Sequence, residues 1–154
     1  MQISKKTQAF TLSEMIVVLI LTSIVVGLAF SVLDLVQKQI LAIKDNYNKN
    51  LELTKLETAL WLDFNRYPNI TYHGFKEELV FKNELDSITY FFSEAYIIKG
   101  QDTFAIQLHQ KQYYFDGKIL NNGQVDALKL EASKAFQNKQ LFVFKQNDAT
   151  SYID

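Results

Sequence analysis

Residues 5–33, KKTQAFTLSEMIVVLILTSIVVGLAFSVL, decide the fold, because a short basic stretch leads there into a long apolar run. The nineteen residues from Met15 to Leu33 carry no charge. Together with the apolar residues just before them they are long enough to cross a bilayer, which takes about 20 apolar residues. Glu14 lies at the start of this segment, and an unpaired charge near the bilayer centre costs at least about 2.5–3.5 kcal/mol. The sequence therefore predicts a membrane-spanning helix in which Glu14 has a cationic partner.

The residues at the start of the apolar run form a motif. Lys5 and Lys6 are basic, Ala9 is small, and Phe10–Glu14 read Phe-Thr-Leu-Ser-Glu. In this order and spacing they resemble the N-terminus of type IV pilin-like proteins, which include minor pilins and the pseudopilins of type II secretion. The resemblance covers about the first 35 residues of the chain.

The resemblance implies a route of processing and assembly. A prepilin peptidase would cut between Ala9 and Phe10 on the cytoplasmic side and methylate the new amine of Phe10. The remaining helix would join a fibre, in which Glu14 faces the Phe10 amine of a neighbouring subunit and sets the axial register. The chain departs from the usual pattern at Ala9, where Gly is usual, and it lacks a proline midway along the helix and a C-terminal disulfide.

An ordinary secretory signal is the alternative interpretation of this end. It would be cut after the apolar run, where residues 27–29, Gly-Leu-Ala, offer small side chains. The run is longer than the roughly 7–15 apolar residues of a signal core, and Glu14 would lie inside it without explanation. We therefore expect the helix to be retained, with Lys5 and Lys6 holding the leader in the cytoplasm.

Composition limits the function of the rest of the chain. The 154 residues suffice for one domain plus an anchor, and the net charge of −1 does not mark a nucleic-acid-binding protein. The absence of cysteine excludes disulfides, thiol catalysis and cysteine metal sites. No hydrolase, nucleotide-binding or zinc-protease motif is present, so the sequence predicts no enzyme and no cofactor.

A single helix is predicted from Phe10 to Tyr67, because Pro68 supplies the stop and Gly27 is the only helix-breaking residue before it. At 1.5 Å per residue this helix measures roughly 85 Å, far more than the thickness of a bilayer, so its outer half must continue outside the membrane. Residues 44–50 contain three asparagines and are a candidate bend.

Two apolar stripes follow helical spacing in the outer half. The first comprises Leu33, Val36, Ile40, Ile43 and Tyr47, and the second comprises Leu53, Leu56, Leu60, Phe64 and Tyr67. Either the first stripe contacts neighbouring helices while the C-terminal domain covers the second, or one curved helix lies with both stripes on a single core. Glu57 and Asp63 are expected to be solvated charges on different faces.

Beyond Pro68 the pattern changes to the alternation of strands. Residues 103–109 alternate as a half-buried strand, with Phe104, Ile106 and Leu108 on one face. Asp-Gly at 116–117 predicts a type I′ hairpin between 112–115 and 118–120, and Asn-Gly at 122–123 a second turn, so residues 112–130 are expected to form a meander. Further strands are predicted at 70–73, 79–82, 87–92, 96–99 and 141–145, with a helical turn or loop at 132–138.

Few side chains outside the N-terminal motif suggest a site. Asp116 and Asp126 could belong to a calcium loop, as some pseudopilins possess, but turn formation sufficiently explains the Asp-Gly and Asn-Gly pairs, and no metal site is predicted. His73 and His109 are the only histidines, and we expect both to be solvated or at strand edges.

These expectations combine into an α+β fold: a long N-terminal helix, transmembrane in its first half, packed on a C-terminal antiparallel β-sheet domain. The resemblance implies the same arrangement, the lollipop shape of pilin-like proteins. The predicted divisions are a leader at 1–9, a transmembrane helix with the methylation motif at 10–35, an amphipathic continuation at 36–67 and a β domain at 68–154.

The expected function is that of a structural pilin or pseudopilin subunit, and a minor one because no disulfide stabilises its head. Its partners would be the prepilin peptidase, other subunits, the inner-membrane assembly platform and membrane lipid. It would cross the inner membrane once, with the β domain in the periplasm or outside the cell. The alternative is an uncleaved, signal-anchored periplasmic binding module for which the helix is only a tether.

Overall fold

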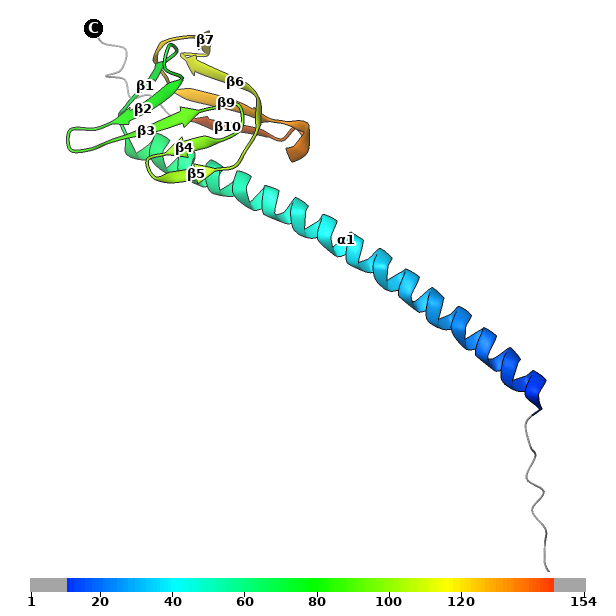
Figure 1. Ribbon diagram of the computed structural model, residues 1–154. Coiled ribbons are helices and arrows are strands. Elements are labelled where there is room, and N and C mark those ends of the chain that lie inside the picture. Colours follow the sequence, from blue (N-terminus) through cyan, green and yellow to red (C-terminus); the bar gives the residue numbers. More distant parts are fainter. Residues whose placement is uncertain (1–10, 146–154) are drawn as a thin grey trace, which may run out of the picture. The chain divides into compact units, whose positions relative to one another are not determined.

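The structure, a computed structural model, describes residues 11–145. Contacts between Cα atoms divide the chain into two compact units, with the division between Lys44 and Asp45. Helix α1 (Leu12–Arg66) contributes to both, and the second unit also holds strands β1–β10 (Figure 1). One long helix followed by antiparallel sheets confirms the predicted α+β class.

Helix α1 ends one residue before Tyr67, the predicted last residue. Its last residue is Arg66, and the N–H of Tyr67 still donates to the carbonyl of Asp63 at 3.0 Å. Pro68 has no N–H to continue the ladder and disfavours helical backbone in the residue before it, so the helix stops there. The asparagine-rich residues 44–50 are helical throughout. The predicted first residue, Phe10, lies outside the described residues.

The two apolar stripes of α1 have different environments. Every residue of the second stripe, from Leu53 to Tyr67, is 0–3% exposed and belongs to the hydrophobic core. Every residue of the first stripe, from Leu33 to Tyr47, is 44–68% exposed. The protein's own sheets therefore cover the second stripe, and contact of the first stripe with neighbouring helices stays a prediction.

The strands form two antiparallel sheets rather than the one that was predicted. The larger has the order β5-β4-β3-β2-β1-β8 and the smaller the order β10-β9-β6-β7. The strands of the larger sheet are β1 (Asn69–His73), β2 (Glu78–Lys82), β3 (Ser87–Phe92), β4 (Ile97–Lys99), β5 (Asp102–Phe104) and β8 (Gly123–Gln124). Those of the smaller are β6 (Leu108–Phe115), β7 (Lys118–Leu120), β9 (Ala127–Ala132) and β10 (Gln140–Phe144), with the 3₁₀ helix η1 (Lys134–Phe136) between the last two.

The predicted hairpin is confirmed, but the predicted meander is wrong. Phe115 pairs with Lys118 across Asp116 and Gly117, whose φ angles of 49° and 71° are both positive, as a type I′ turn requires. After β7, however, the chain crosses to the larger sheet, where β8 pairs with β1. It then returns as β9 to the opposite edge of β6.

The single strand predicted over residues 103–109 is also wrong. β5 ends at Phe104 and β6 begins at Leu108, so residues 105–107 connect the two sheets. Phe104 and Ile106 are nevertheless buried, and Leu108 packs against the core. The apolar residues alternate here because the chain crosses from the larger sheet to the smaller one, over the core that the two sheets share.

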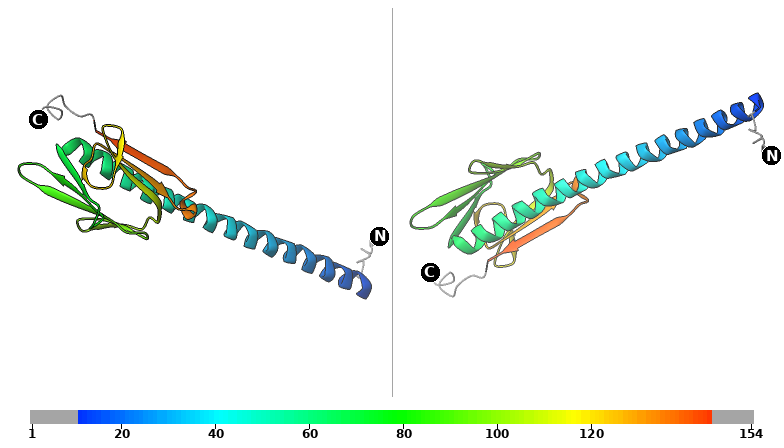
Figure 2. Two further views of the ribbon diagram at one scale, coloured as in Figure 1. Left: turned by 90° about the horizontal axis from the view of Figure 1, so that it is seen from above. Right: turned by 90° about the horizontal axis from the view of Figure 1, so that it is seen from below.

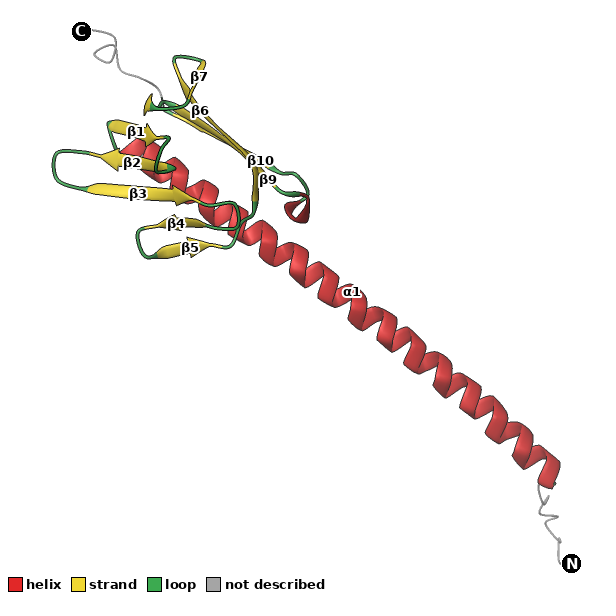
Figure 3. Ribbon diagram, turned by 45° about the horizontal axis from the view of Figure 1, so that its top comes forward, coloured by secondary structure: helices red, strands yellow, loops and turns green. Residues whose placement is uncertain are grey.

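That core joins the C-terminal turns of α1 to both sheets. Figure 3 shows strands of the larger sheet and strands of the smaller sheet to either side of these turns, and the view from below shows the same arrangement (Figure 2). Phe64 contacts Phe81 of β2 edge to face at a centroid distance of 5.3 Å, and Trp61 contacts Phe144 of β10 at 5.3 Å. Such pairs contribute about 0.5–1.5 kcal/mol beyond the burial of area.

Candidate functional site

The N-terminus of α1 is closed by a reciprocal pair of residues. The backbone N–H and the hydroxyl of Thr11 both donate to Oε2 of Glu14, at 2.8 and 2.9 Å, and the backbone N–H of Glu14 donates to the Thr11 hydroxyl at 3.4 Å. Thr11 precedes the first helical residue, Leu12, and Glu14 is the third residue of the helix. This arrangement is a capping box, which satisfies N–H groups that the first turn leaves without partners.

The sequence analysis missed this second role of Glu14, although its signal was present. A Thr followed three residues later by Glu, directly before an apolar run, is the usual sequence pattern of a capping box. The cap uses Oε2 alone, because Oε1 accepts no hydrogen bond from the described residues. Capping therefore leaves one carboxylate oxygen for a cation. Lys5, Lys6, Ala9 and Phe10 lie outside the described residues.

The helix behind this cap presents an apolar surface. Among residues 11–145, α1 is the one helix long and apolar enough to cross a membrane by length and composition. From Met15 to Leu33 every large apolar side chain is 47–66% exposed. Of its hydroxyls, those of Thr22, Ser23 and Ser31 donate to carbonyls four residues earlier, at 2.7–3.1 Å. These polar groups are satisfied within the helix, as a lipid-facing helix requires.

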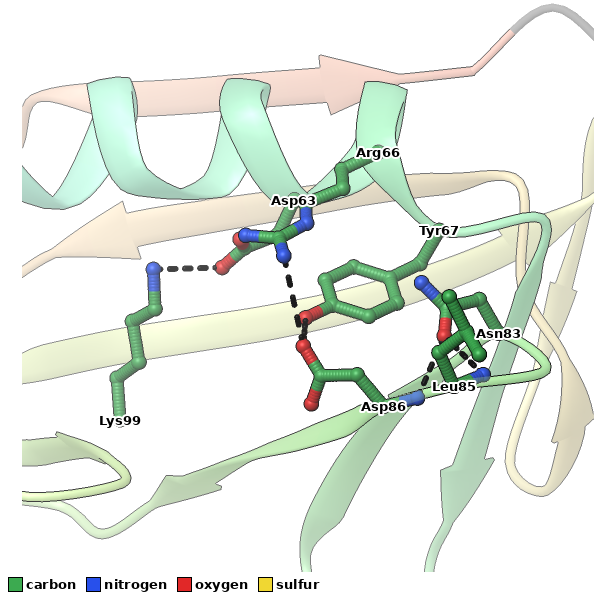
Figure 4. Close-up of polar contacts among 7 residues, drawn as sticks. All are labelled: Asp63, Arg66, Tyr67, Asn83, Leu85, Asp86 and Lys99. Carbon is green, nitrogen blue, oxygen red and sulfur yellow. Dashed lines mark hydrogen bonds and ion pairs between the residues drawn. The ribbon is translucent and has the colours of Figure 1, made fainter.

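In the sheet domain, the prediction that Asp63 is solvated is wrong. Asp63 is only 5% exposed. Its Oδ2 accepts a hydrogen bond from the Tyr90 hydroxyl at 2.5 Å and forms an ion pair with Lys99 Nζ at 2.8 Å. Figure 4 shows the Lys99 contact. Burial, followed by the hydrogen bond to Asp63, raises the pKa of Tyr90 far above its ordinary value. This cluster ties α1 to β3 and β4 and leaves the carboxylate inaccessible to a substrate.

A second polar cluster fixes the end of α1. Oδ2 of Asp86 accepts a hydrogen bond from the Tyr67 hydroxyl at 2.8 Å and lies 3.5 Å from the Arg66 guanidinium (Figure 4). Oδ1 of Asn83 accepts the backbone N–H groups of Leu85 and Asp86, which shapes the β2–β3 turn. The hydrogen bond to Asp86 raises the pKa of Tyr67. Both clusters hold structure in place and offer no reactive group.

The other candidates from the sequence fall into turns and exposed positions. Oδ2 of Asp126 accepts the backbone N–H of Asp116 at 2.7 Å, so this carboxylate supports the β6–β7 turn. His73 and His109 are both exposed, on different strands. Within residues 11–145, no group of three or more His, Asp and Glu residues is placed to hold a metal ion.

Comparison with known proteins bears on the N-terminal segment. A family model described as the prokaryotic N-terminal methylation motif matches residues 4–30, the part of the chain with the basic stretch, Phe10–Glu14 and most of the apolar run. Neither a curated protein nor a solved structure matches the chain significantly. The match confirms the resemblance drawn from the sequence. Residues 4–30 of the chain therefore carry the N-terminal methylation motif that is typical of type IV pilins and pseudopilins.

Proposed function

We propose that this protein is a structural subunit, and a minor one, of a type IV pilus or a type II secretion pseudopilus. It is cut by a prepilin peptidase between Ala9 and Phe10, methylated on the Phe10 amine and assembled through its N-terminal helix. The chain is in this proposal the substrate of an enzyme and not itself an enzyme.

One observation carries the proposal: the methylation motif is in register with the start of the helix. The proposed cut before Phe10 lies within residues 4–30, which the family model matches, and α1 begins two residues after Phe10, at Leu12. From Leu12 to Leu33, Glu14 is the only ionisable residue. A charge at this position in an apolar segment is costly unless it is paired. A new amine at Phe10 would supply the pair.

The layout proposed for the chain follows from this. Residues 1–9 are the leader, 10–35 cross the inner membrane, 36–67 continue as an amphipathic helix, and 68–154 form a β domain in the periplasm or outside the cell. The apolar surface of α1 contacts membrane lipid before assembly and other subunits afterwards. The inner-membrane assembly platform is the partner that would move the subunit from the membrane into the fibre.

Glu14 acts in this proposal through its free carboxylate oxygen. While Oε2 caps the helix, Oε1 can accept a hydrogen bond from the Phe10 amine of a neighbouring subunit. A subunit in the wrong axial position would leave both charges unpaired in an apolar environment, which is strongly unfavourable. Pairing therefore selects the register, while apolar helix packing supplies contact area.

The test is the intact mass and N-terminal sequence of the protein extracted from its native membrane. We expect a chain that lacks residues 1–9 and begins at N-methylated Phe10. A chain that still begins at Met1 would leave Glu14 without the proposed amine and would favour the tethered periplasmic module. A chain that begins within or after the apolar run would instead identify an ordinary secretory signal.

A further inference from the structure

Strand β6 has an open edge in its first half. On one side β9 pairs with it from Leu108 to Tyr114, but on the other side β7 pairs only with Tyr113–Phe115. Among the described residues, no strand covers that second edge over 109–112. The Tyr114 carbonyl accepts the N–H of Asp126, on the β9 side. Since backbone groups alternate along a strand, those of Lys111 point to the open edge.

Two clefts, each of about 410 Å³, follow this edge. Lys111 lines both of them. Its Nζ donates a hydrogen bond to the Phe92 carbonyl of the larger sheet at 3.0 Å and forms an ion pair with Glu77 Oε2 at 3.0 Å. The first cleft lies towards Tyr113, and the second lies towards His109. The open edge therefore has one cleft on each side of Lys111.

The first cleft is suited to an apolar side chain. Phe75, in the β1–β2 turn, is 105% exposed and Ile119 of β7 is 60% exposed, and both line this cleft. Tyr113, another lining residue, is buried, and its hydroxyl has no hydrogen-bond partner among the described residues. Phe75 and Ile119 therefore give this cleft an exposed apolar rim that an apolar side chain of a partner could cover.

The second cleft is suited to a cation. Glu77 and Glu94 both line it, and the one lysine that lines it, Lys111, already forms an ion pair with Glu77. Glu94 is exposed, and its backbone carbonyl accepts the N–H of Leu108 at 3.2 Å. Among Glu77, Glu94 and Lys111, the acidic side chains therefore outnumber the basic one in this cleft.

We propose that a short extended segment of a partner protein adds to β6 along residues 109–112, with an apolar side chain in the first cleft and a Lys or Arg in the second. Strand addition to a sheet edge takes its affinity from main-chain hydrogen bonds and its specificity from pockets for alternate side chains. Side chains four residues apart on a strand point to the same face and are about 13 Å apart. Tyr113 lines the first cleft and His109 lines the second, and these two residues are four apart on β6. The site does not depend on processing or on assembly into a fibre.

The probe is a fluorescein-labelled peptide, TLTSTKT, whose leucine precedes its lysine by four residues, added to the full-length chain in detergent micelles. In an antiparallel orientation to β6 its leucine meets the first cleft and its lysine the second. The reversed peptide, TKTSTLT, has the same composition. We expect TLTSTKT to bind more tightly by fluorescence anisotropy and to slow hydrogen exchange at the Lys111 amide.

Each cleft has a variant and a matched control. Phe75→Ser is expected to weaken binding about tenfold, and Glu94→Gln about threefold. Leu85→Ser and Glu84→Gln replace equivalent exposed side chains of the β2–β3 turn and should leave binding unchanged. The proposal is overturned if neither peptide binds, if both bind equally without protecting Lys111, or if Phe75→Ser acts only by lowering self-association of the chain.

Discussion

At the residue scale, two carboxylates on α1 show how their surroundings decide what an acidic side chain does. Asp63 is buried between a phenol and an ammonium group, Tyr90 and Lys99. Glu14 is exposed and bonded to Thr11 alone among the described residues. These two partners of Asp63 lie within the sheet domain, whereas Glu14 keeps one carboxylate oxygen that can bind a group of another chain.

Replacing Asp63 should destabilise the sheet domain strongly. Asp63→Ala leaves the ammonium group of Lys99, whose side chain is 18% exposed, without its partner. Breaking a buried pair in this way costs about 3–5 kcal/mol. We expect this loss in the free energy of unfolding, measured in urea by the fluorescence of Trp61, the single tryptophan.

Glu57→Ala is the control for this prediction, since it removes a carboxylate from the same helix at a partly exposed position. We expect a change within about 0.5 kcal/mol. Equal losses in the two variants would mean that the Asp63 cluster contributes no more than an ordinary surface charge.

Gly74 is required by the close approach of another part of the chain. A Cβ at this position would collide with the backbone carbonyl oxygen of Asn121, which cannot rotate away as a side chain could. Gly74→Ala should therefore lower the free energy of unfolding by about 1–3 kcal/mol, the usual cost of overpacking. His73→Ala, at the exposed neighbouring position, is the control and should unfold with the parent in the same urea titration.

At the scale of elements, local pattern predicted the pieces but not their order in the sheets. The stripe from Leu53 to Tyr67 and the hairpin at Asp116 each follow from spacing within a few residues, and both are confirmed. The crossing of residues 105–107 and the pairing of β8 with β1 depend on contacts between distant segments. Periodicity carries no information about which strand lies beside which.

The same limit explains the error at Asp63. Its position on the helix places it beside the buried stripe, but the partners that make its burial tolerable, Tyr90 and Lys99, lie 27 and 36 residues further along the chain. The capping box is the opposite case, because Thr11 and Glu14 are three residues apart and their pattern could be read directly.

The capping role of Glu14 can be separated from its proposed pairing role. Glu14→Gln keeps an oxygen that can accept from Thr11, since Gln also serves in capping boxes, but it removes the negative charge. We expect this variant to insert into the membrane normally and to enter fibres as poorly as Glu14→Ala, in a cysteine-crosslinking assay between subunits.

Thr11→Ala supplies the complementary variant, because it removes the hydroxyl of the cap and leaves the charge. Loss of an N-cap costs about 1 kcal/mol locally, and we expect incorporation to fall much less than in Glu14→Gln. If Glu14→Gln assembled as well as the parent while Thr11→Ala failed, the carboxylate would act through the cap alone, and the pairing of Glu14 with an amine would be wrong.

At the scale of the whole molecule, the sheet domain has one aromatic core shared by both sheets. Tyr72 and Tyr113 stack across them at a centroid distance of 3.6 Å, and Phe92 contacts Tyr113 at 6.2 Å. Burial raises the pKa of Tyr113 and that of Tyr90 far above the ordinary value, because the phenolate form would have to leave water.

These raised pKa values predict alkaline unfolding of the sheet domain. Below about pH 10, the pKa of an unfolded tyrosine, both states hold the phenol protons, and the stabilisation from Tyr90 and Tyr113 is fully present. Above it, the unfolded chain releases protons that the folded chain keeps, so the free energy of unfolding falls by about 1.4 kcal/mol per pH unit for each of these tyrosines.

Tyr113→Phe isolates one of the two contributions. Since the Tyr113 hydroxyl has no partner among the described residues, the variant should be at least as stable as the parent at pH 7. Between about pH 10 and 12 the free energy of unfolding of the variant should fall less steeply than that of the parent. The difference between the two slopes should be about 1.4 kcal/mol per pH unit, in urea titrations followed by Trp61 fluorescence. Tyr90→Phe should show the same gentler slope, but its free energy of unfolding should be about 1 kcal/mol lower at pH 7, because Asp63 loses a hydrogen bond.

Parallel curves for the parent and Tyr113→Phe would mean that Tyr113 titrates in the folded protein as it does in the unfolded chain, and that the core between the sheets admits water.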